Sequence, residues 1–361
     1  MTSTYLAASV AFITLPLIIS PKSNLSKNLK LILHSTIYTS GLAVNSLWGV
    51  FTSIFALVGG QRYRQQINWL VARSFHKSIS PLVGWSFNVI DEHNLEPFAT
   101  VDDNKRQSCI LIGNHQTALD ILYLGRIFPK FAAMMAKKEI KKIPLLGWWM
   151  TLSGAVFINR KDRADAINAF NRIGQEIKSR RISLWIFPEG TRSSTPQPSL
   201  LPFKKGAFHL AIQAQIPIVP IVCENYYHLA NFNFNKNEGD GKGSRFERGQ
   251  LGLKVLDPIS TEGLTSDDVQ ELIDYTHAYM LHSLEELSAN STSLTNKPNK
   301  PQPFTLKPPK GKNNSSIINN EKTNISNNDI NNKINNEQDK QNKSDDNNEE
   351  VDDDVVLVDK Q

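Results

Sequence analysis

Two charge-free apolar runs dominate the first 61 residues of the chain. Residues 1–21 carry no charged side chain, and 12 of the 15 residues from Tyr5 to Ile19 are apolar. No Lys or Arg precedes this run, which argues against a cleavable signal peptide. The second run, Leu31–Gln61, would be about 46 Å long as a helix, more than the roughly 30 Å hydrocarbon core of a bilayer. Its best bilayer stretch is Leu42–Gly60, and the alternative is a buried helix of a soluble protein.

The segment that follows the second run is amphipathic. Its apolar residues fall at helical spacing, and its basic residues lie largely off that face: Tyr63, Ile67, Leu70, Val71 and Phe75 against Arg62, Arg64, Arg73 and Lys77. This pattern favours an interfacial helix that lies on anionic headgroups, and the alternative is an ordinary amphipathic surface helix.

Basic residues both between the two apolar runs and after the second one favour the cytosolic side of a membrane. Two full crossings cannot place both groups on that side. A shallow hairpin formed by the two apolar runs, or a single crossing, satisfies them better, and we favour the hairpin. Residues 1–83 are therefore expected to form a membrane-embedded helical pair with its associated segment.

An α/β domain is expected over residues 84–287. Short β-rich apolar runs predict strands at 108–114, 154–159, 182–187, 216–222 and 250–257. Helical periodicity is found at 164–180, 205–215 and 267–287. This alternation predicts a mostly parallel sheet flanked by helices. Ligands of such sheets bind beyond the carboxyl ends of the strands, so the informative residues are sought there.

The last part of the chain, residues 288–361, is polar and is expected to be disordered. Residues 291–361 contain 16 Asn and no Arg, and cannot bury enough apolar surface to offset the entropy of ordering. Their ten Lys and twelve acidic residues give a net charge of −2, so the +5 of the whole chain leaves +7 on residues 1–290. Such a basic folded part favours an anionic partner: a membrane surface, a phosphate-bearing substrate or nucleic acid.

Neither nucleic acid nor a metal ion finds support in the motifs. No helix-turn-helix or RNA-binding signature is present, so nucleic acid is not expected as a partner. The two cysteines, Cys109 and Cys223, lie in apolar runs and have no zinc-site spacing. We therefore expect buried thiols, no disulfide scaffold and no metal site.

The first candidate catalytic motif is GNHQTALD, residues 113–120. On one continuous helix His115 and Asp120 would lie about 140° apart, too far for contact. If His115 lies in the turn before a helix and Asp120 in its first turn, the carboxylate can reach the imidazole and orient it as a base. The alternative is structural, because Thr117 and Asp120 nearly match a helix capping box.

Three further motifs follow predicted strands or form them. In FPEGTRS (187–193), Gly190 allows close approach to a ligand, Thr191 and Arg192 suit a phosphate, and Glu189 would orient Arg192 or a substrate hydroxyl. Arg160, at the end of GAVFINR, is a second candidate phosphate ligand. The strand IPIVPIV (216–222) is expected to form a pocket wall. Each motif alone also fits a plain turn, a surface charge or a core strand.

Taken in this order behind a membrane segment, the motifs resemble those of the glycerolipid acyltransferase family, in particular its fungal 1-acylglycerol-3-phosphate acyltransferases. The similarity covers about residues 85–285 and includes the segments LDILYLGRIFP, AKKEIKKIPLLGWWM and LPFKKGAFHLAIQAQIPIVPI. The segment Leu229–Gly249 is longer and more polar than the family pattern leads us to expect.

The resemblance implies a role for each motif. His115 would be the general base that deprotonates the sn-2 hydroxyl of lysophosphatidic acid, and Asp120 its orienting carboxylate. Acyl-CoA would be the co-substrate, with no further cofactor. The implied substrate-binding residues are Asn114, Arg160, Glu189, Gly190, Thr191 and Arg192, with Val219, Pro220 and Ile221 linked to acyl-CoA. The family also implies the endoplasmic reticulum membrane, and we expect the catalytic domain to face the cytosol.

Three other functions remain open from the residues. A related acyltransferase could use glycerol-3-phosphate or another lysophospholipid. A hydrolase would use water in place of the lipid hydroxyl. A catalytically silent membrane-binding protein would tolerate loss of His115.

Overall fold

The computed structural model describes residues 27–158, 173–232, 244–290 and 307–309. The labelled helices of these parts are α2 (Lys27–Gly59), α3 (Gln61–Val83), η1 (Glu92–Leu95), α4 (Glu96–Ala99), α5 (Asp120–Ile127), η2 (Lys138–Lys142), α6 (Leu146–Leu152), α8 (Gly206–Ala214), η3 (Ser266–Asp268) and α9 (Val269–Asn290). The strands are β1 (Trp85–Ile90), β2 (Ile110–Gly113), β3 (Ala132–Lys137), β4 (Val156–Ile158), β5 (Ser183–Ile186), β6 (Ile218–Cys223), β7 (Ala230–Asn231), β8 (Arg245–Phe246) and β9 (Gly249–Val255).

A mostly parallel seven-stranded sheet forms the centre of the fold, in the order β1-β9-β6-β2-β5-β3-β4. Strands β2 to β6 run in one direction, and β9 pairs antiparallel with β6 and parallel with β1. The carboxyl ends of β2, β5 and β6 therefore meet at one edge. Strands β7 and β8 form a separate antiparallel pair. The predicted α/β class is confirmed.

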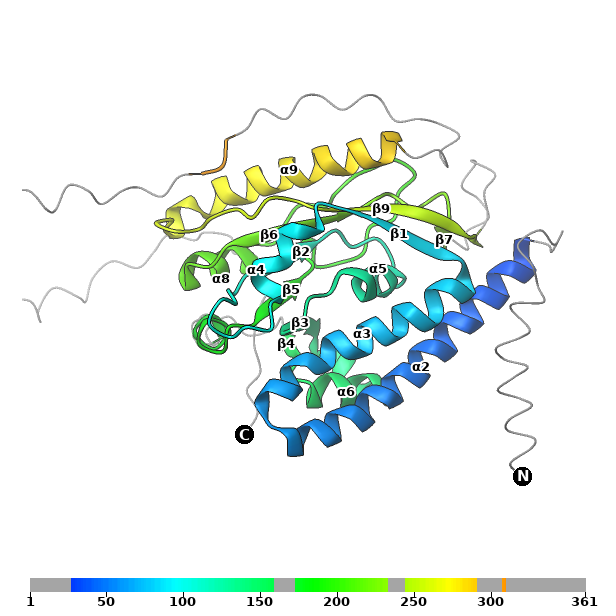
Figure 1. Ribbon diagram of the computed structural model, residues 1–361. Helices are drawn as coiled ribbons and strands as arrows, with labels where there is room; N and C mark the ends of the chain where they lie inside the picture. The colour runs from blue at the N-terminus through cyan, green and yellow to red at the C-terminus, as the bar shows by residue number, and fades with distance from the viewer. Residues whose placement is uncertain (1–26, 159–172, 233–243, 291–306, 310–361) are drawn as a thin grey trace, which may run out of the picture.

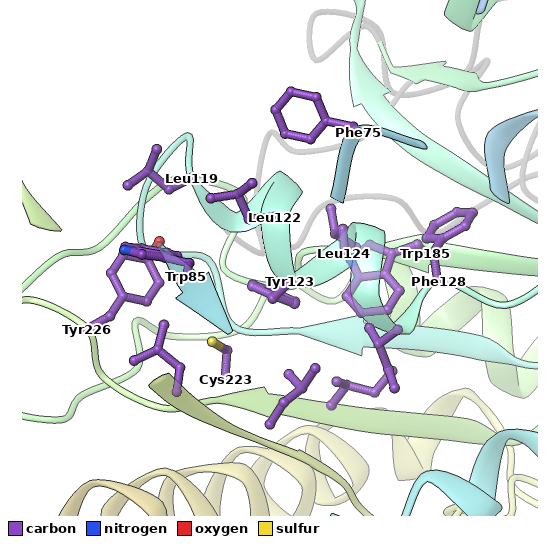
Figure 2. Packing of buried hydrophobic residues seen from close by; sticks show 14 of the residues in the cluster. Phe75, Trp85, Leu119, Leu122, Tyr123, Leu124, Phe128, Trp185, Cys223 and Tyr226 are labelled. Atoms are coloured by element: carbon purple, nitrogen blue, oxygen red, sulfur yellow. The ribbon is translucent and has the colours of Figure 1, made fainter. Parts of the chain in front are cut away.

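Each face of the sheet is covered by its own set of helices, as Figure 1 shows. Side chains alternate along the buried strands, so that Leu111 and Trp185 pack toward α3 and α5, whereas Ile110 and Leu184 pack toward α8 and α9. Figure 2 shows the first of these cores, with Tyr123 and Leu122 of α5 lying over the sheet. The layers hold the strand ends, and the residues that follow them, in fixed positions.

Helices α2 and α3 form a hairpin that packs on the sheet side occupied by α5. The turn is made at Gly60, whose φ of 85° favours glycine. Among the described residues, the span Asn28–Gly59 is the one helix long and apolar enough to cross a membrane. It exposes a row of large apolar side chains: Leu29, Ile32, Val44, Leu47, Trp48, Phe51, Ile54, Phe55, Leu57 and Val58.

The interfacial interpretation of residues 62–80 is wrong. The apolar face of α3 is turned into the protein, with Ile67, Val71 and Phe75 at most 5% exposed. Arg64 and Arg73 donate to the backbone carbonyl oxygens of Leu152 and Arg126. These side chains bind protein rather than headgroups, because α5 and α6 supply the surface that the amphipathic pattern requires. The structure supports the alternative of an amphipathic helix packed on a protein core.

Several predicted features lie outside the described residues. They are the first apolar run, most of the helix at 164–180, most of the polar segment 229–249 and nearly all of the C-terminal tail. The hairpin predicted from the two apolar runs stays a prediction. Residues 173–180 of the predicted helix are described and are helical.

Candidate active site

His115 lies in the turn between β2 and α5. Strand β2 ends at Gly113, where a Cβ would come within 2.6 Å of the Trp185 ring, so glycine is required for the close packing of the strand. Helix α5 begins at Asp120, where the positive end of the helix dipole favours a carboxylate. Nδ1 of His115 lies 2.7 Å from Oδ2 of Asp120. This is the arrangement expected for a histidine before the helix and an aspartate in its first turn.

The carboxylate of Asp120 is buried and is bound at both oxygens. Besides His115, Oδ2 accepts hydrogen bonds from the backbone N–H groups of Gln116 at 2.8 Å and Thr117 at 3.2 Å. Oδ1 accepts a hydrogen bond of 2.5 Å from the phenol of Tyr226. The capping alternative is thus realised in part, because Asp120 binds the N–H of Thr117. The same side chain holds the turn and orients the imidazole.

A second contact fixes the plane of the imidazole. The ring of Phe187, the residue after β5, stacks on His115 with a centroid separation of 4.0 Å and an angle of 14°. The imidazole is therefore held at one edge by Asp120 and on one face by an aromatic ring. The His115 side chain is 19% exposed and lines a cavity.

Glu189 holds the backbone on which His115 is mounted. Its Oε1 accepts from the N–H of His115 at 2.8 Å, and its Oε2 accepts from the N–H of Leu201 at 3.0 Å. Burial raises the pKa of Glu189, and the two backbone N–H groups oppose that rise. Both oxygens thus bind backbone groups, and the expected orientation of Arg192 or a substrate hydroxyl by Glu189 stays a prediction.

Asn114 joins two strands rather than facing a ligand. Its Nδ2 donates to the carbonyl oxygen of Cys223 at 2.9 Å, and its Oδ1 accepts from the N–H of the same residue at 2.9 Å. The side chain is 1% exposed. This pair of hydrogen bonds fastens the end of β2 to the end of β6. Asn114 therefore has a structural role in joining the two strands, and its position does not support the expected contact with a substrate.

The structure does not bring Val219, Pro220 and Ile221 to the cavity. All three lie on β6 in the centre of the sheet, and Val219 and Ile221 have no exposed surface. They pack beneath the site, because β6 is flanked on both sides by other strands. The expected contact of these side chains with acyl-CoA is not supported by this position.

The cavity that reaches His115 has a volume of about 650 Å³. This is the size range of ligand sites in proteins. Its wall is formed largely by apolar side chains of α2, α3, α5, β3 and α6, among them Leu42, Val71, Leu124, Met134 and Trp149. Gly190, Thr191 and Arg192 line the same cavity, as do Lys137 and Lys204. One cavity thus combines a long apolar wall, a histidine and cationic side chains.

Two further predictions on the site concern Arg160 and a metal ion. Arg160 lies outside the described residues, so its place is a prediction still. Within the parts of the chain that are described, no group of three or more His, Cys, Asp or Glu side chains could hold a metal ion.

Sequence reasoning missed Phe187 and Tyr226. Phe187 could have been found as part of its motif, whereas Tyr226 is 106 residues from Asp120 and has no local signal.

Comparison with known proteins identifies the family. The Acyltransferase family model matches residues 86–224, which include both the His115 and the Glu189 motifs. An uncharacterized acyltransferase of Schizosaccharomyces pombe is 40% identical over 68% of this chain and 81% of its own length. The chain belongs to the acyltransferase family. The 1-acyl-sn-glycerol-3-phosphate acyltransferase of Saccharomyces cerevisiae is 38% identical over 73% of this acyltransferase and 81% of its own chain.

Two more distant comparisons agree with this assignment. Human 1-acyl-sn-glycerol-3-phosphate acyltransferase alpha is 35% identical over 70% of this acyltransferase and 83% of its own length. The crystal structure of the 1-acyl-sn-glycerophosphate acyltransferase of Thermotoga maritima superimposes with a TM-score of 0.57 at 23% identity, covering 74% of this chain and 100% of that one. This likeness shows the shared fold. As an acyltransferase, the enzyme must bring an acyl donor and an acceptor together.

Proposed function

We propose that this acyltransferase moves an acyl group from acyl-CoA to the sn-2 hydroxyl of lysophosphatidic acid, giving phosphatidic acid and CoA. The observation that carries the proposal is the His115–Asp120 pair, 2.7 Å apart, on the wall of an apolar cavity that also holds Arg192. The names of the yeast and human relatives support the choice of acceptor.

The geometry suits a general-base mechanism in which the acceptor itself is the nucleophile. Asp120 binds Nδ1 of His115, so the proton on this nitrogen is held and Nε2 is left to face a substrate. Nε2 takes the proton of the lipid hydroxyl while the oxygen attacks the thioester carbonyl. The tetrahedral intermediate then expels the CoA thiolate, which takes the proton back from the imidazolium. Asp120 stabilises the imidazolium between these two steps.

The cationic side chains of the cavity fit the phosphate of the acceptor. Arg192 presents a planar guanidinium suited to a phosphate, and Lys204 lies on the same cavity wall. Arg160 is proposed as a further phosphate ligand. The apolar wall can hold an acyl chain, which leaves the reacting carbonyl near the imidazole. Binding of both substrates in this geometry would supply much of the rate through proximity.

We further propose that α2 attaches the enzyme to the endoplasmic reticulum membrane with the catalytic domain on the cytosolic side. The exposed apolar row of α2 supports membrane contact. The lysines before α2 and at its start, and the arginines after it, favour the cytosolic side. Acyl-CoA is soluble in the cytosol and lysophosphatidic acid inserts in the bilayer, so a site at this boundary can reach both.

The function is tested with membranes that contain the wild-type protein, His115→Ala or the control His209→Ala. His209 is an exposed residue of α8 away from the cavity lining. Labelled acyl-CoA is supplied with lysophosphatidic acid, glycerol-3-phosphate, lysophosphatidylcholine or no acceptor, and the lipid products are separated.

We expect phosphatidic acid from the wild type and the control, only with lysophosphatidic acid, and a loss of at least 1000-fold in His115→Ala. Product with another acceptor would keep the mechanism and replace the substrate. Free fatty acid formed without an acceptor would indicate a hydrolase. Substantial activity in His115→Ala would contradict the assignment of the base.

A further inference from the structure

Tyr226 reaches the catalytic pair from a distant part of the chain. It lies three residues after the end of β6 and its side chain has no exposed surface. Its ring packs edge-on against the indole of Trp85 with a centroid separation of 5.1 Å, and Figure 2 shows the two rings side by side. The ring is thus fixed by the core, and only its hydroxyl is turned toward the turn that carries His115.

The neighbours of this hydroxyl determine the direction of its hydrogen bonds. The backbone N–H of Thr117 can only donate, and it does so to the phenol oxygen at 3.0 Å. The Oγ1 of Thr117 lies 2.9 Å from the same oxygen and already accepts from the N–H of Leu119, so its own proton is free to be donated to the phenol. The phenol proton is then directed at Oδ1 of Asp120, 2.5 Å away.

We propose that Tyr226 is a positioning residue for the catalytic pair: its hydroxyl holds Oδ1 of Asp120, so that Oδ2 stays against Nδ1 of His115 and the negative charge is shared between the two oxygens. This inference rests on the proposed general-base function of His115. Tyr226 does not line the cavity, so it acts through Asp120 and not on the substrate. Burial and the nearby Asp120 raise the pKa of Tyr226 well above its ordinary value, which keeps the donor protonated at every working pH.

Removing this hydroxyl has a predictable effect on the imidazole. Without the phenol, the charge of Asp120 concentrates on Oδ2, and the imidazolium form of His115 becomes more favourable. The other titratable groups near the pair are Glu189 after β5, Cys223 on β6, Tyr38 on α2, Tyr123 on α5 and Arg192 in the loop after β5. All of them are the same in wild type and variant, so a difference between the two isolates Tyr226.

The experiment compares the wild type with Tyr226→Phe and with the matched control Tyr123→Phe. The first change removes the hydroxyl and keeps the ring against Trp85. The control removes an equally buried phenol hydroxyl that donates instead to the carbonyl oxygen of Asn114 at 2.7 Å. Both variants are made in the full chain, and thermal melts establish that each one folds.

Two measurements are made on these proteins. The first is the pH dependence of kcat/KM for phosphatidic acid formation. The second is the titration of His115 followed by NMR of labelled histidine in detergent-solubilised protein, with the signal assigned from His115→Asn. The titration needs no substrate and therefore decides the role of Tyr226 even if the acceptor proposed above is wrong.

For Tyr226→Phe we expect kcat to fall about 10-fold with KM for lysophosphatidic acid unchanged. The acid limb of the profile and the midpoint of the His115 titration should both move upward by about 0.5 to 1 pH unit. In Tyr123→Phe neither should move. A titration midpoint that stays in place in Tyr226→Phe overturns the proposal, whatever happens to kcat, because a merely structural role would leave the imidazole unchanged. Absence of phosphatidic acid from the wild type overturns the proposed function alone.

Discussion

The imidazole of His115 is constrained in two perpendicular ways. Asp120 binds its Nδ1 edge at 2.7 Å, and Phe187 covers one of its faces at 4.0 Å. The hydrogen bond to Asp120 selects the tautomer of the imidazole. The stacking on Phe187 opposes rotation of the ring about the axis of that hydrogen bond. In the proposed role of base, an imidazole held in this way would lose little entropy when the lipid hydroxyl arrives.

Replacing the stacked ring tests this constraint. Phe187→Leu keeps an apolar side chain but removes the flat surface against the imidazole. We expect kcat to fall about fivefold, the rate equivalent of about 1 kcal/mol for an aromatic pair. Phe128→Leu is the control, since Phe128 lines the same cavity and packs on Trp185 rather than on His115. Equal losses of kcat in both variants would show that the stacking itself has no role.

The part of the site that could be predicted from the sequence is the part built from neighbours in the chain. His115 and Asp120 are five residues apart, so a strand-turn-helix pattern predicts that the carboxylate can reach the ring, with a helix capping box as the alternative. Glu189 was found as a candidate, but its partner was not, because its bond to the N–H of His115 depends on β5 lying next to β2. Tyr226 and the partner of Asn114 were missed for the same reason, since sequence spacing does not give strand order.

At the scale of elements, the five predicted strands are found because each is a short run of branched or aromatic apolar residues. Strands β1 and β3 of the seven-stranded sheet were missed, as was the short pair β7 and β8. β1 lies at the edge of the sheet and its apolar run is interrupted by Ser86 and Asn88, and β3 is built largely from Ala and Met, which favour strands little. The α3 helix was located correctly, but the surface under its apolar face could not be read from its own sequence.

The contact between α3 and α5 positions the helix that begins with Asp120. At Gly125 of α5, a Cβ would lie 2.3 Å from the backbone oxygen of Ala72 on α3. A backbone atom cannot yield as a flexible side chain does. The two helices therefore depend on this glycine for their close approach.

We expect Gly125→Ala to lower the free energy of unfolding by about 1 to 3 kcal/mol, the usual cost of overpacking a core. Chemical denaturation of the solubilised full chain would measure it. Gly174→Ala is the matched control, because Gly174 is also helical and its nearest neighbour is the Cβ of Ala214 at 3.2 Å. The idea of a required close approach would be abandoned if Gly125→Ala were as stable as the wild type.

At the scale of the whole molecule, the two sides of α2 face different environments. One side contributes Tyr38, Leu42 and Asn45 to the cavity wall. The other exposes large apolar side chains, among them Phe51 at 51% and Phe55 at 62%. Such a row on one helix is typical of a surface that contacts lipid.

The double substitution Phe51→Ser and Phe55→Ser should weaken membrane association. Removal of each ring loses about 2 kcal/mol of favourable free energy of transfer into the bilayer. The fraction of the protein released from membranes by alkaline carbonate measures the effect and should rise above that of the wild type. Val101→Ser is the control, since Val101 is 52% exposed in the loop after α4. Equal release of all three proteins would contradict lipid contact by this face of α2.

The position of β9 between β1 and β6 has a consequence for the order in which a growing chain can fold on the ribosome. Strand β1 is complete at residue 90, but its partner in the sheet ends at Val255. The fastening of Asn114 to Cys223 likewise waits until both strands have been synthesised. The edge of β1 and the His115 turn therefore stay unfinished through the synthesis of more than a hundred residues, while α2 can already reach a bilayer. Attachment of α2 at that stage would tether the chain before its sheet is complete.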